Sequence, residues 1–478
     1  MSPERTASER IAEFLTALRP EDIPPEVLQR AKLHLLDTLG AGIAGAASRE
    51  VLLSRSALAA AHGTPSPGTG SPVWGTPAGL PPLAAAFVNG VACHAFELDD
   101  SGGCDHSGAV VVPAALAALA VRAGGSAGGA DDGGTGVDGG RLLHAVVSGY
   151  EVGRRVQDAL GGYDPVNNQG WHSTGVTGTF AAAVAAGVVL GLDAPQLVSA
   201  IGLAGSFTGG TWAFIGDGAM SKRMHVGRAA EAGLNSALLA KAGFTGPRDV
   251  FSAPWGSFLK LYGQPGDVQE SRLFDTLGED WQVQRASIKP YATCRSTHSA
   301  IDAILELRDR GITAEATQKI TVRTSALIAD MCGTADVRSL VSTQLSMQFA
   351  LAAALMHGTV GLDEVAEQGR NDPRLRELMG RIHVEVDPEQ HGGSAEPFLT
   401  VQTDTDSFGV QAVKAKGAAT NRLSDQETIG KFEGLAGTRL PGDRVKAISK
   451  LVLGLESVAD AGTLLGLLAA DSEPAVLR

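Results

Sequence analysis

Residues 170–192, GWHSTGVTGTFAAAVAAGVVLGL, decide the fold class of this chain. From position 177 onward the stretch carries no charge and consists almost entirely of small and aliphatic residues. It is shorter than a typical membrane span, and its alanines and glycines allow close helix contacts. We therefore expect a buried helix here, surrounded by other helices.

The sequence on both sides of this stretch has the same helical character. Residues 25–46, PEVLQRAKLHLLDTLGAGIAGA, place apolar residues at helical spacing after Pro24 and Pro25, which favour a helix start. Further helices are predicted at residues 80–98, 109–121, 142–161, 194–204 and 229–242, and nothing in the first 270 residues alternates as a strand. Residues 124–140, GGSAGGADDGGTGVDGG, predict a flexible surface loop; a linker between domains is the alternative.

The pattern changes after about residue 281. Residues 319–325 and 381–387 alternate as strands, and residues 398–403 and 409–413 predict a hairpin bent at 404–408. Helices are expected at 301–310 and 343–356, and the tail from residue 425 is helical again. The sequence thus predicts a mainly α protein. A large all-helical domain of residues 1–279 plus 423–478 would carry an inserted, smaller α+β domain of residues 280–422.

Composition narrows the functional classes. The 478 residues are 44% hydrophobic and 19% charged, which is typical of a globular protein. The net charge of −13, with no basic stripe, argues against a nucleic-acid partner. Four cysteines without a CxxC pair indicate a reducing compartment, and no signal peptide or membrane span is recognised, so a cytoplasmic protein is expected. No phosphate loop, GxGxxG element, zinc signature or GxSxG elbow occurs.

Two polar clusters lie in the first half of the chain. Glu97-Leu98-Asp99-Asp100 is followed by His106, which can form an acid/base pair with an aspartate. An acidic helix end beside a surface histidine is the alternative. In the second cluster, His172 precedes Ser173 and Thr174, either of which could cap the central helix and leave its N–H groups free for a carboxylate. A cap with an incidental histidine explains the same residues.

Three more clusters follow. Lys222 and His225, in SKRMHVGR, would share a helix face, unless this is a solvated basic helix end. Residues 289–298, KPYATCRSTH, lie at the predicted domain junction, where ligand clefts are common, although a loop and a helix start explain them too. Residues 342–349, STQLSMQF, are better explained by a capping serine and core packing. Cys294 is a nucleophile candidate, but a buried, inert thiol is the simpler interpretation.

In this order and spacing the clusters resemble the 2-methylcitrate dehydratase / cis-aconitate decarboxylase family, MmgE/PrpD. The similar stretches span nearly the whole chain and include LLDTLGAGIAG, SKRMHVGRAAEAGLNSALLAKAGFTGP and IKPYATCRSTHSAIDAI. The resemblance implies a helical domain, an α+β lid domain and an active site between them. It also implies a homodimer without a metal or organic cofactor, which dehydrates, decarboxylates or epimerises small di- and tricarboxylates.

The resemblance assigns roles residue by residue. Asp99 and His106 match the acidic run and the catalytic histidine of the family, and Lys222 and His225 match its Lys-x-x-His element. These four are the predicted catalytic residues. The predicted substrate-binding residues match the glycine–aromatic–His element and the lid-side signature, and they are His172, Lys289, Tyr291, Arg295 and His298.

Three departures from the family pattern lie on the substrate side. Ser101-Gly102 replaces Thr-His, in a segment about two residues short; His106-Ser107 replaces His-Pro; and Phe349 replaces a tyrosine. They indicate a changed substrate more than a changed proton chemistry. We expect a cofactor-independent dehydratase acting on a citrate- or methylcitrate-like polycarboxylate. Decarboxylation and epimerisation on the same site stay open, as does a non-catalytic carboxylate-binding relative.

Overall fold

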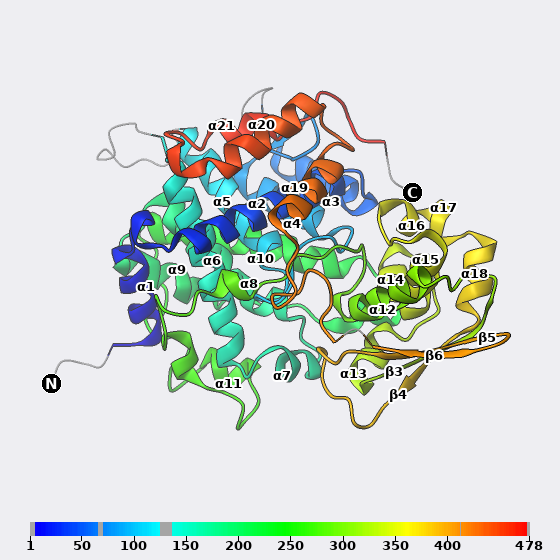
Figure 1. Cartoon of the computed structure of the whole chain (residues 1–478). Coiled ribbons are helices and arrows are strands. Elements are labelled where there is room, and N and C mark those ends of the chain that lie inside the picture. The colour runs from blue at the N-terminus through cyan, green and yellow to red at the C-terminus, as the bar shows by residue number, and fades with distance from the viewer. Residues whose placement is uncertain (1–4, 66–69, 125–135, 412, 476–478) are drawn as a thin grey trace.

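The computed structural model describes residues 5–65, 70–124, 136–411 and 413–475. Long helices make up the larger part of the molecule, and a smaller α+β region with a sheet lies at one side (Figure 1). The mainly α fold with a smaller α+β part that the sequence predicts is therefore confirmed, and the structure shows that the sheet of this part is mixed. The division at residues 279/280 and 422/423 stays a prediction.

The predicted buried helix is α8 (Ser173–Leu190), at the centre of the helical region. It packs against α5 (Ser107–Ala123), α6 (Gly139–Ala159), α9 (Ala194–Ala204) and α10 (Ser221–Lys241). The contact with α10 is close, since a Cβ on Gly233 would lie 2.4 Å from that of Ala182. By length and composition α8 could cross a membrane, yet all of it is buried inside the protein, as in the core helix of a globular domain.

The C-terminal tail packs back on the N-terminal half. Helix α2 (Pro25–Gly45) begins at the predicted proline, and α19 (Asp425–Ala436) and α20 (Gly442–Leu453) both pack against it. The other α-helices of this region are α1 (Ala7–Ala17), α3 (Arg49–His62), α4 (Pro82–His94), α7 (Tyr163–Asn168), α11 (Phe258–Tyr262) and α21 (Thr463–Leu467). Short 3₁₀ segments are η1 (Pro20–Asp22), η2 (Trp212–Gly216), η3 (Glu270–Leu273), η4 (Gln282–Arg285), η5 (Arg295–Thr297) and η6 (Leu455–Ser457).

The α+β region contains a four-stranded sheet in the order β4-β3-β5-β6. Strand β3 (Thr317–Thr324) pairs in parallel with β4 (Ile382–Val386) and antiparallel with β5 (Phe398–Thr403), which pairs antiparallel with β6 (Ser407–Val410). Helix α12 (His298–Asp309) contacts β5, and α15 (Met347–His357) contacts β4. The remaining helices are α13 (Ala326–Cys332), α14 (Leu340–Gln344), α16 (Leu362–Val365), α17 (Glu367–Arg370) and α18 (Pro373–Met379).

Several predicted boundaries are wrong. Helix α10 begins eight residues before position 229, so the SKRMH segment forms its first turns. The segment predicted as one helix at 343–356 contains the end of α14 and most of α15. The two are separate because the Ser346 side chain accepts a hydrogen bond from Phe349 N and so caps the start of α15. The last strand ends at Val410 rather than residue 413, and residue 412 lies outside the described residues. Most of the predicted loop 124–140 also lies outside them, with α6 beginning at Gly139.

The first 270 residues also contain one small strand pair, β1 (Ser71–Pro72) with β2 (Gly79–Leu80). Two-residue strands are too short to produce an alternating pattern, which is why the sequence did not indicate them. The apolar core around the sheet extends onto the helical region, since it includes Ala41 and Ala44 of α2 and Phe96 and Leu98 beyond α4. This shared core brings residues 95–106 against the α+β region.

Candidate active site

The loop of residues 95–106, which joins α4 to α5, carries most of the carboxylates of the candidate site. Glu97 and Asp105 have positive φ angles of 55° and 78°, and only one other non-glycine residue in the described ranges does. Such backbone persists where surrounding contacts hold it, and it is common at functional sites. The loop is tied to the segment before Lys289 by two main-chain hydrogen bonds between Ser101 and Ser287.

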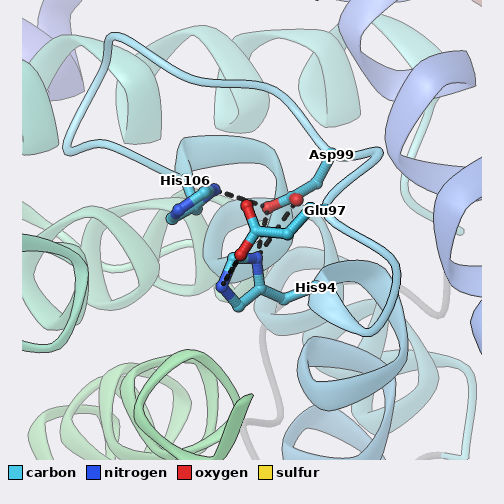
Figure 2. A group of neighbouring side chains, drawn as sticks. All are labelled: His94, Glu97, Asp99 and His106. Atoms are coloured by element: carbon cyan, nitrogen blue, oxygen red, sulfur yellow. Dashed lines mark hydrogen bonds and ion pairs between the residues drawn. The ribbon is translucent and has the colours of Figure 1, made fainter. Parts of the chain in front are cut away.

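His106 and Asp99 form the first pair of the site. The His106 Nδ1 atom lies 2.9 Å from Asp99 Oδ2 and 3.2 Å from the Asp100 carbonyl oxygen, so this nitrogen carries the donated hydrogen. Asp99 also contacts His94 Nδ1 at 3.0 Å, and Figure 2 shows these groups with Glu97. The second nitrogen of His106, Nε2, lies 3.5 Å from Asp105 Oδ2, a distance that leaves it able to exchange a proton with a bound ligand.

The carboxylates decide the charge of His106. Burial lowers the pKa of its imidazole, but the Asp105 and Asp99 carboxylates raise it, and the net result is a raised pKa. Burial alone would raise the pKa of Asp99, yet His106, His94 and Lys289 hold it well below its ordinary value. Both shifts favour an imidazolium beside a carboxylate, so His106 is suited to donate a proton.

Glu97 is the centre of a second, denser cluster. Lys222 contacts its Oε1, the Arg223 guanidinium lies 2.8 Å from the same oxygen, and Lys289 Nζ lies 2.9 Å from Oε2. Burial raises the pKa of Glu97, but Lys222 and Lys289 dominate and hold it well below its ordinary range. Burial lowers the pKa of Lys289, but Glu97 and Asp99 raise it by more than burial lowers it. The net result is a raised pKa, so this ammonium stays charged. The cluster brings together residues of α10, the loop after α4 and the segment before α12.

His172 and His225 form a neutral pair beside this cluster. Their Nδ1 atoms are 3.3 Å apart, and Gly210 packs so closely that a Cβ there would lie 2.9 Å from the His225 ring. Burial and then Lys222 lower the pKa of His225 to about 4, and the same causes hold that of His172 well below its ordinary value. Both rings are therefore uncharged at pH 7 and can accept a proton.

The predicted cap of α8 is wrong. His172 occupies the N-cap position and makes no side-chain capping hydrogen bond. Ser173 and Thr174 lie inside the first turn, where Ser173 Oγ donates to Asp105 Oδ2 over 3.4 Å and Thr174 Oγ1 accepts from His106 N over 3.4 Å. These hydroxyls bind the residues before α5 instead of capping their own helix.

A cavity of about 510 Å³ opens between the helical and the α+β regions. Its size suits a small carboxylate, since binding sites for small molecules commonly span ~300–1,000 Å³. Lys222, Lys289, Arg295 and Arg154 supply the positive charge of its wall. The other lining residues come from both regions and are Glu97, Ser101, Gly102, Asp105, His106, Gly161, Tyr163, Asp164, Pro165, Trp212, Ser287, Cys294, Ser296, Gly393 and Ser394.

The predicted lid-side residues divide into two groups. Lys289 and Arg295 line the cavity, and the Arg295 side chain is 29% exposed with only a 3.7 Å contact to Glu396. Tyr291 instead donates its hydroxyl to Asp302 Oδ1 over 2.6 Å, and the buried His298 places Nε2 3.2 Å from the Thr293 carbonyl oxygen. Neither Tyr291 nor His298 is among the described residues that line the cavity, and the same holds for His172 and His225. Substrate contact by these four stays a prediction.

The structure adds residues for which the sequence assigned no role. Glu97 belongs to the acidic run, but no role was predicted for it. Arg223 lies between Lys222 and His225 on α10, and its guanidinium binds both Glu97 and Gln344. Arg154 lines the cavity, contacts the Gly102 carbonyl oxygen and binds Asp158 Oδ1 at 2.8 Å. Asp105 was adjacent to the predicted histidine, and that adjacency was the only available signal.

His94, Glu97, Asp99 and His106 have the donor types of a metal site, with ligand atoms within 4.8 Å of one another (Figure 2). Their charges are already balanced by protein groups, however. Lys222, Arg223 and Lys289 neutralise Glu97, and both histidines direct Nδ1 at Asp99. A divalent cation would have to displace these partners, so the donor set does not fit a resident metal.

Comparison with known proteins gives the family. Residues 9–270 match the MmgE/PrpD N-terminal domain and residues 291–457 the MmgE/PrpD C-terminal domain. The chain belongs to the MmgE/PrpD family. It is 32% identical to the cis-aconitate decarboxylase-like protein oryM of Aspergillus oryzae, with 98% of each chain covered. It is 30% identical to a cis-aconitate decarboxylase of Aspergillus terreus (96% and 95% covered) and 28% identical to that of Homo sapiens (99% and 96%).

Membership confirms the family predicted from the sequence, whose members are lyases acting on citrate-type carboxylates. These relatives are named cis-aconitate decarboxylase or decarboxylase-like, whereas the sequence favours dehydration.

Proposed function

We propose that this protein is a lyase that decarboxylates a small, cis-aconitate-like carboxylate, with His106 as the proton donor. One observation carries the proposal. His106 directs Nδ1 at Asp99 over 2.9 Å, the carboxylates of Asp105 and Asp99 raise its pKa, and it lines a cavity whose wall holds Lys222, Lys289 and Arg295. The same reaction is supported by full-length relatives that are named cis-aconitate decarboxylase or cis-aconitate decarboxylase-like.

The reaction needs few groups. Arg295 would hold a substrate carboxylate, because its guanidinium is partly free and can bind both oxygens. When the bond from carbon to the departing carboxylate breaks, its electron pair stays on the substrate carbon chain and carbon dioxide leaves. His106 Nε2–H then protonates the carbon, and Lys222 and Lys289 stabilise the negative charge that develops on the remaining carboxylate.

Dehydration of a citrate-type acid is the second candidate. The protonated His106 would serve this reaction too, by donating its proton to the departing hydroxyl. Dehydration also needs a base at the substrate, and the neutral His172 and His225 do not line the described cavity. Decarboxylation is placed first for this reason.

The test is incubation of the full chain with cis-aconitate, citrate and 2-methylcitrate in deuterated water, followed by ¹H NMR and carbon dioxide release. We expect carbon dioxide from cis-aconitate and one deuterium in the product. Loss of water without carbon dioxide would identify a dehydratase, and deuterium exchange without net reaction an epimerase. Calorimetric binding of these acids with neither exchange nor turnover would identify a non-catalytic relative.

A homodimer and a cytoplasmic location complete the proposal. Analytical ultracentrifugation of the full chain tests the first, and fractionation of cells that produce the protein tests the second.

A further inference from the structure

Asp105 lies directly before His106 and places a second carboxylate at the imidazole. Its Oδ2 atom is 3.5 Å from His106 Nε2, 3.4 Å from Ser173 Oγ and 4.0 Å from His172 Nε2. Its side chain is 14% exposed and lines the cavity. Asp105 is held in the left-handed region, at φ 78°, so the loop directs this carboxylate into the cavity at a cost in backbone energy.

The two ring nitrogens of His106 therefore face different carboxylates. Asp99 binds Nδ1 from the buried side at 2.9 Å, and Asp105 faces Nε2 from the cavity side. Among the described residues, the ion-pair contacts of Asp105 are with His106 and His172, and no lysine or arginine neutralises it. An imidazole flanked by carboxylates at both nitrogens favours its charged form.

We propose that Asp105 is a positioning residue that keeps His106 protonated at its cavity-facing nitrogen, and that its negative charge excludes a substrate carboxylate from this corner. The proposal deepens the proposed function, because it rests on His106 being the proton donor. The substrate group that meets Asp105 would then be uncharged, such as a CH₂ or a hydroxyl, and the carboxylates would bind on the wall of Lys222, Lys289 and Arg295.

The other groups around His106 do not supply this effect. The His94 ring on α4 is tilted by 54° against it, with ring centroids 4.0 Å apart, and the ring of His172 at the start of α8 lies 6.1 Å away. The pKa values of both rings are held well below the ordinary value, which keeps them neutral. Lys289 opposes protonation, as does burial, whereas Asp105 and then Asp99 raise the pKa of His106. The charged or titratable groups that face His106 are Asp99, Asp105, Glu97, His94, His172 and Lys289. The Glu97 carboxylate lies within 4.8 Å of the imidazole, but its charge is already met by Lys222, Arg223 and Lys289.

The variant Asp105→Asn tests the first half of the proposal. Asparagine tolerates left-handed backbone, so the loop conformation can be kept while the charge is removed. The pKa of His106, followed by NMR of the resting enzyme with labelled histidine, should fall by about one to two units. Because the protonated form is the active one, the alkaline limb of the kcat profile should move to lower pH by the same amount.

The matched control is Asp164→Asn. Asp164 also lines the cavity, but it accepts a hydrogen bond from the Gly393 N–H over 3.1 Å, and within the described ranges it forms no ion pair or hydrogen bond with His106. This variant also removes one negative charge from the cavity wall, and the pKa of His106 should stay unchanged in it. If Asp105→Asn does not fold, Asp105→Gly replaces it, because glycine adopts positive φ freely.

An unchanged His106 titration in Asp105→Asn would overturn the protonation role. The titration needs no turnover, so it decides this role even if the protein releases no carbon dioxide from any acid tested. For the exclusion role, Asp105→Asn should lower KM for a tricarboxylate such as cis-aconitate by more than for a dicarboxylate such as citraconate. Equal changes in the two KM values would overturn that half.

Discussion

Two carboxylates eight residues apart on the same loop have opposite surroundings. Glu97 is 1% exposed and binds Lys222, Arg223 and Lys289. Asp105 faces the cavity and contacts only histidines and Ser173 among the described residues. Both have left-handed backbone, so local strain does not distinguish them. The difference lies in how far each charge is compensated.

We infer that the Glu97 cluster, whose charge is balanced by three cations, holds the structure of the site. The surroundings of Asp105, whose charge has no cation partner among the described residues, would instead take part in the chemistry. A buried carboxylate that holds three cations fixes the lysines that line the cavity, but its own oxygens are occupied. A carboxylate without a cation instead influences the nearest titratable ring, His106, and any ligand that enters. Substitutions in the two places should therefore separate stability from chemistry.

The largest effect is expected from Glu97→Gln. The substitution leaves three buried cations without their shared carboxylate, and we expect the free energy of unfolding to fall by about 3–5 kcal/mol. Urea unfolding followed by circular dichroism measures it. Glu9→Gln, which removes an exposed pair with Arg248, should cost less than about 1 kcal/mol. Similar losses in the two variants would show that the Glu97 cluster is not a structural centre.

His106→Gln should affect the reaction and spare the fold. We expect kcat for the true substrate to fall by about 10²–10⁴-fold, the usual contribution of a general acid, with most of the unfolding free energy retained. Steady-state kinetics and urea unfolding of the same preparation give both numbers. His62→Gln at the end of α3 is the control and should match the unsubstituted chain. Activity within twofold of normal would remove His106 from the mechanism.

Arg295→Ala tests the cationic wall. Loss of a charged hydrogen bond of about 1.5–3 kcal/mol predicts a KM increase of roughly 10–150-fold, with a smaller change in kcat. Arg323→Ala, on β3 and outside the cavity, removes an equally charged residue as a control. An unchanged KM would mean that the substrate carboxylates bind elsewhere.

The smallest effect is expected from Tyr291→Phe. Its hydroxyl binds Asp302, so the substitution should cost about 1 kcal/mol of stability and change kcat and KM by less than twofold. Thermal unfolding and kinetics measure these. A tenfold rise in KM would instead indicate that Tyr291 contacts the substrate, as the resemblance predicted.

Local patterns carried the correct predictions. The helical spacing of residues 25–46 and the uncharged stretch before Leu192 found α2 and α8, because helix formation depends on neighbours three and four positions apart. Asp99 and His106 are seven residues apart on one loop, and their pairing could be expected from that proximity. The apolar pattern of α10 begins only at residue 229, although the shared helix face expected for Lys222 and His225 agrees with the observed start at Ser221.

The sequence alone determined the helical core, the α+β region and the family, and it named part of the set of polar residues that could carry the chemistry. The tertiary structure decided which of these residues meet. Lys222 and Lys289 lie 125 and 192 positions from Glu97, and the lid-side histidine and tyrosine face their own segment rather than the cavity. The periodicity of the sequence shows which face of a helix is buried, because that pattern is local. A buried charge needs a partner, and which groups become its partners depends on how distant segments pack together.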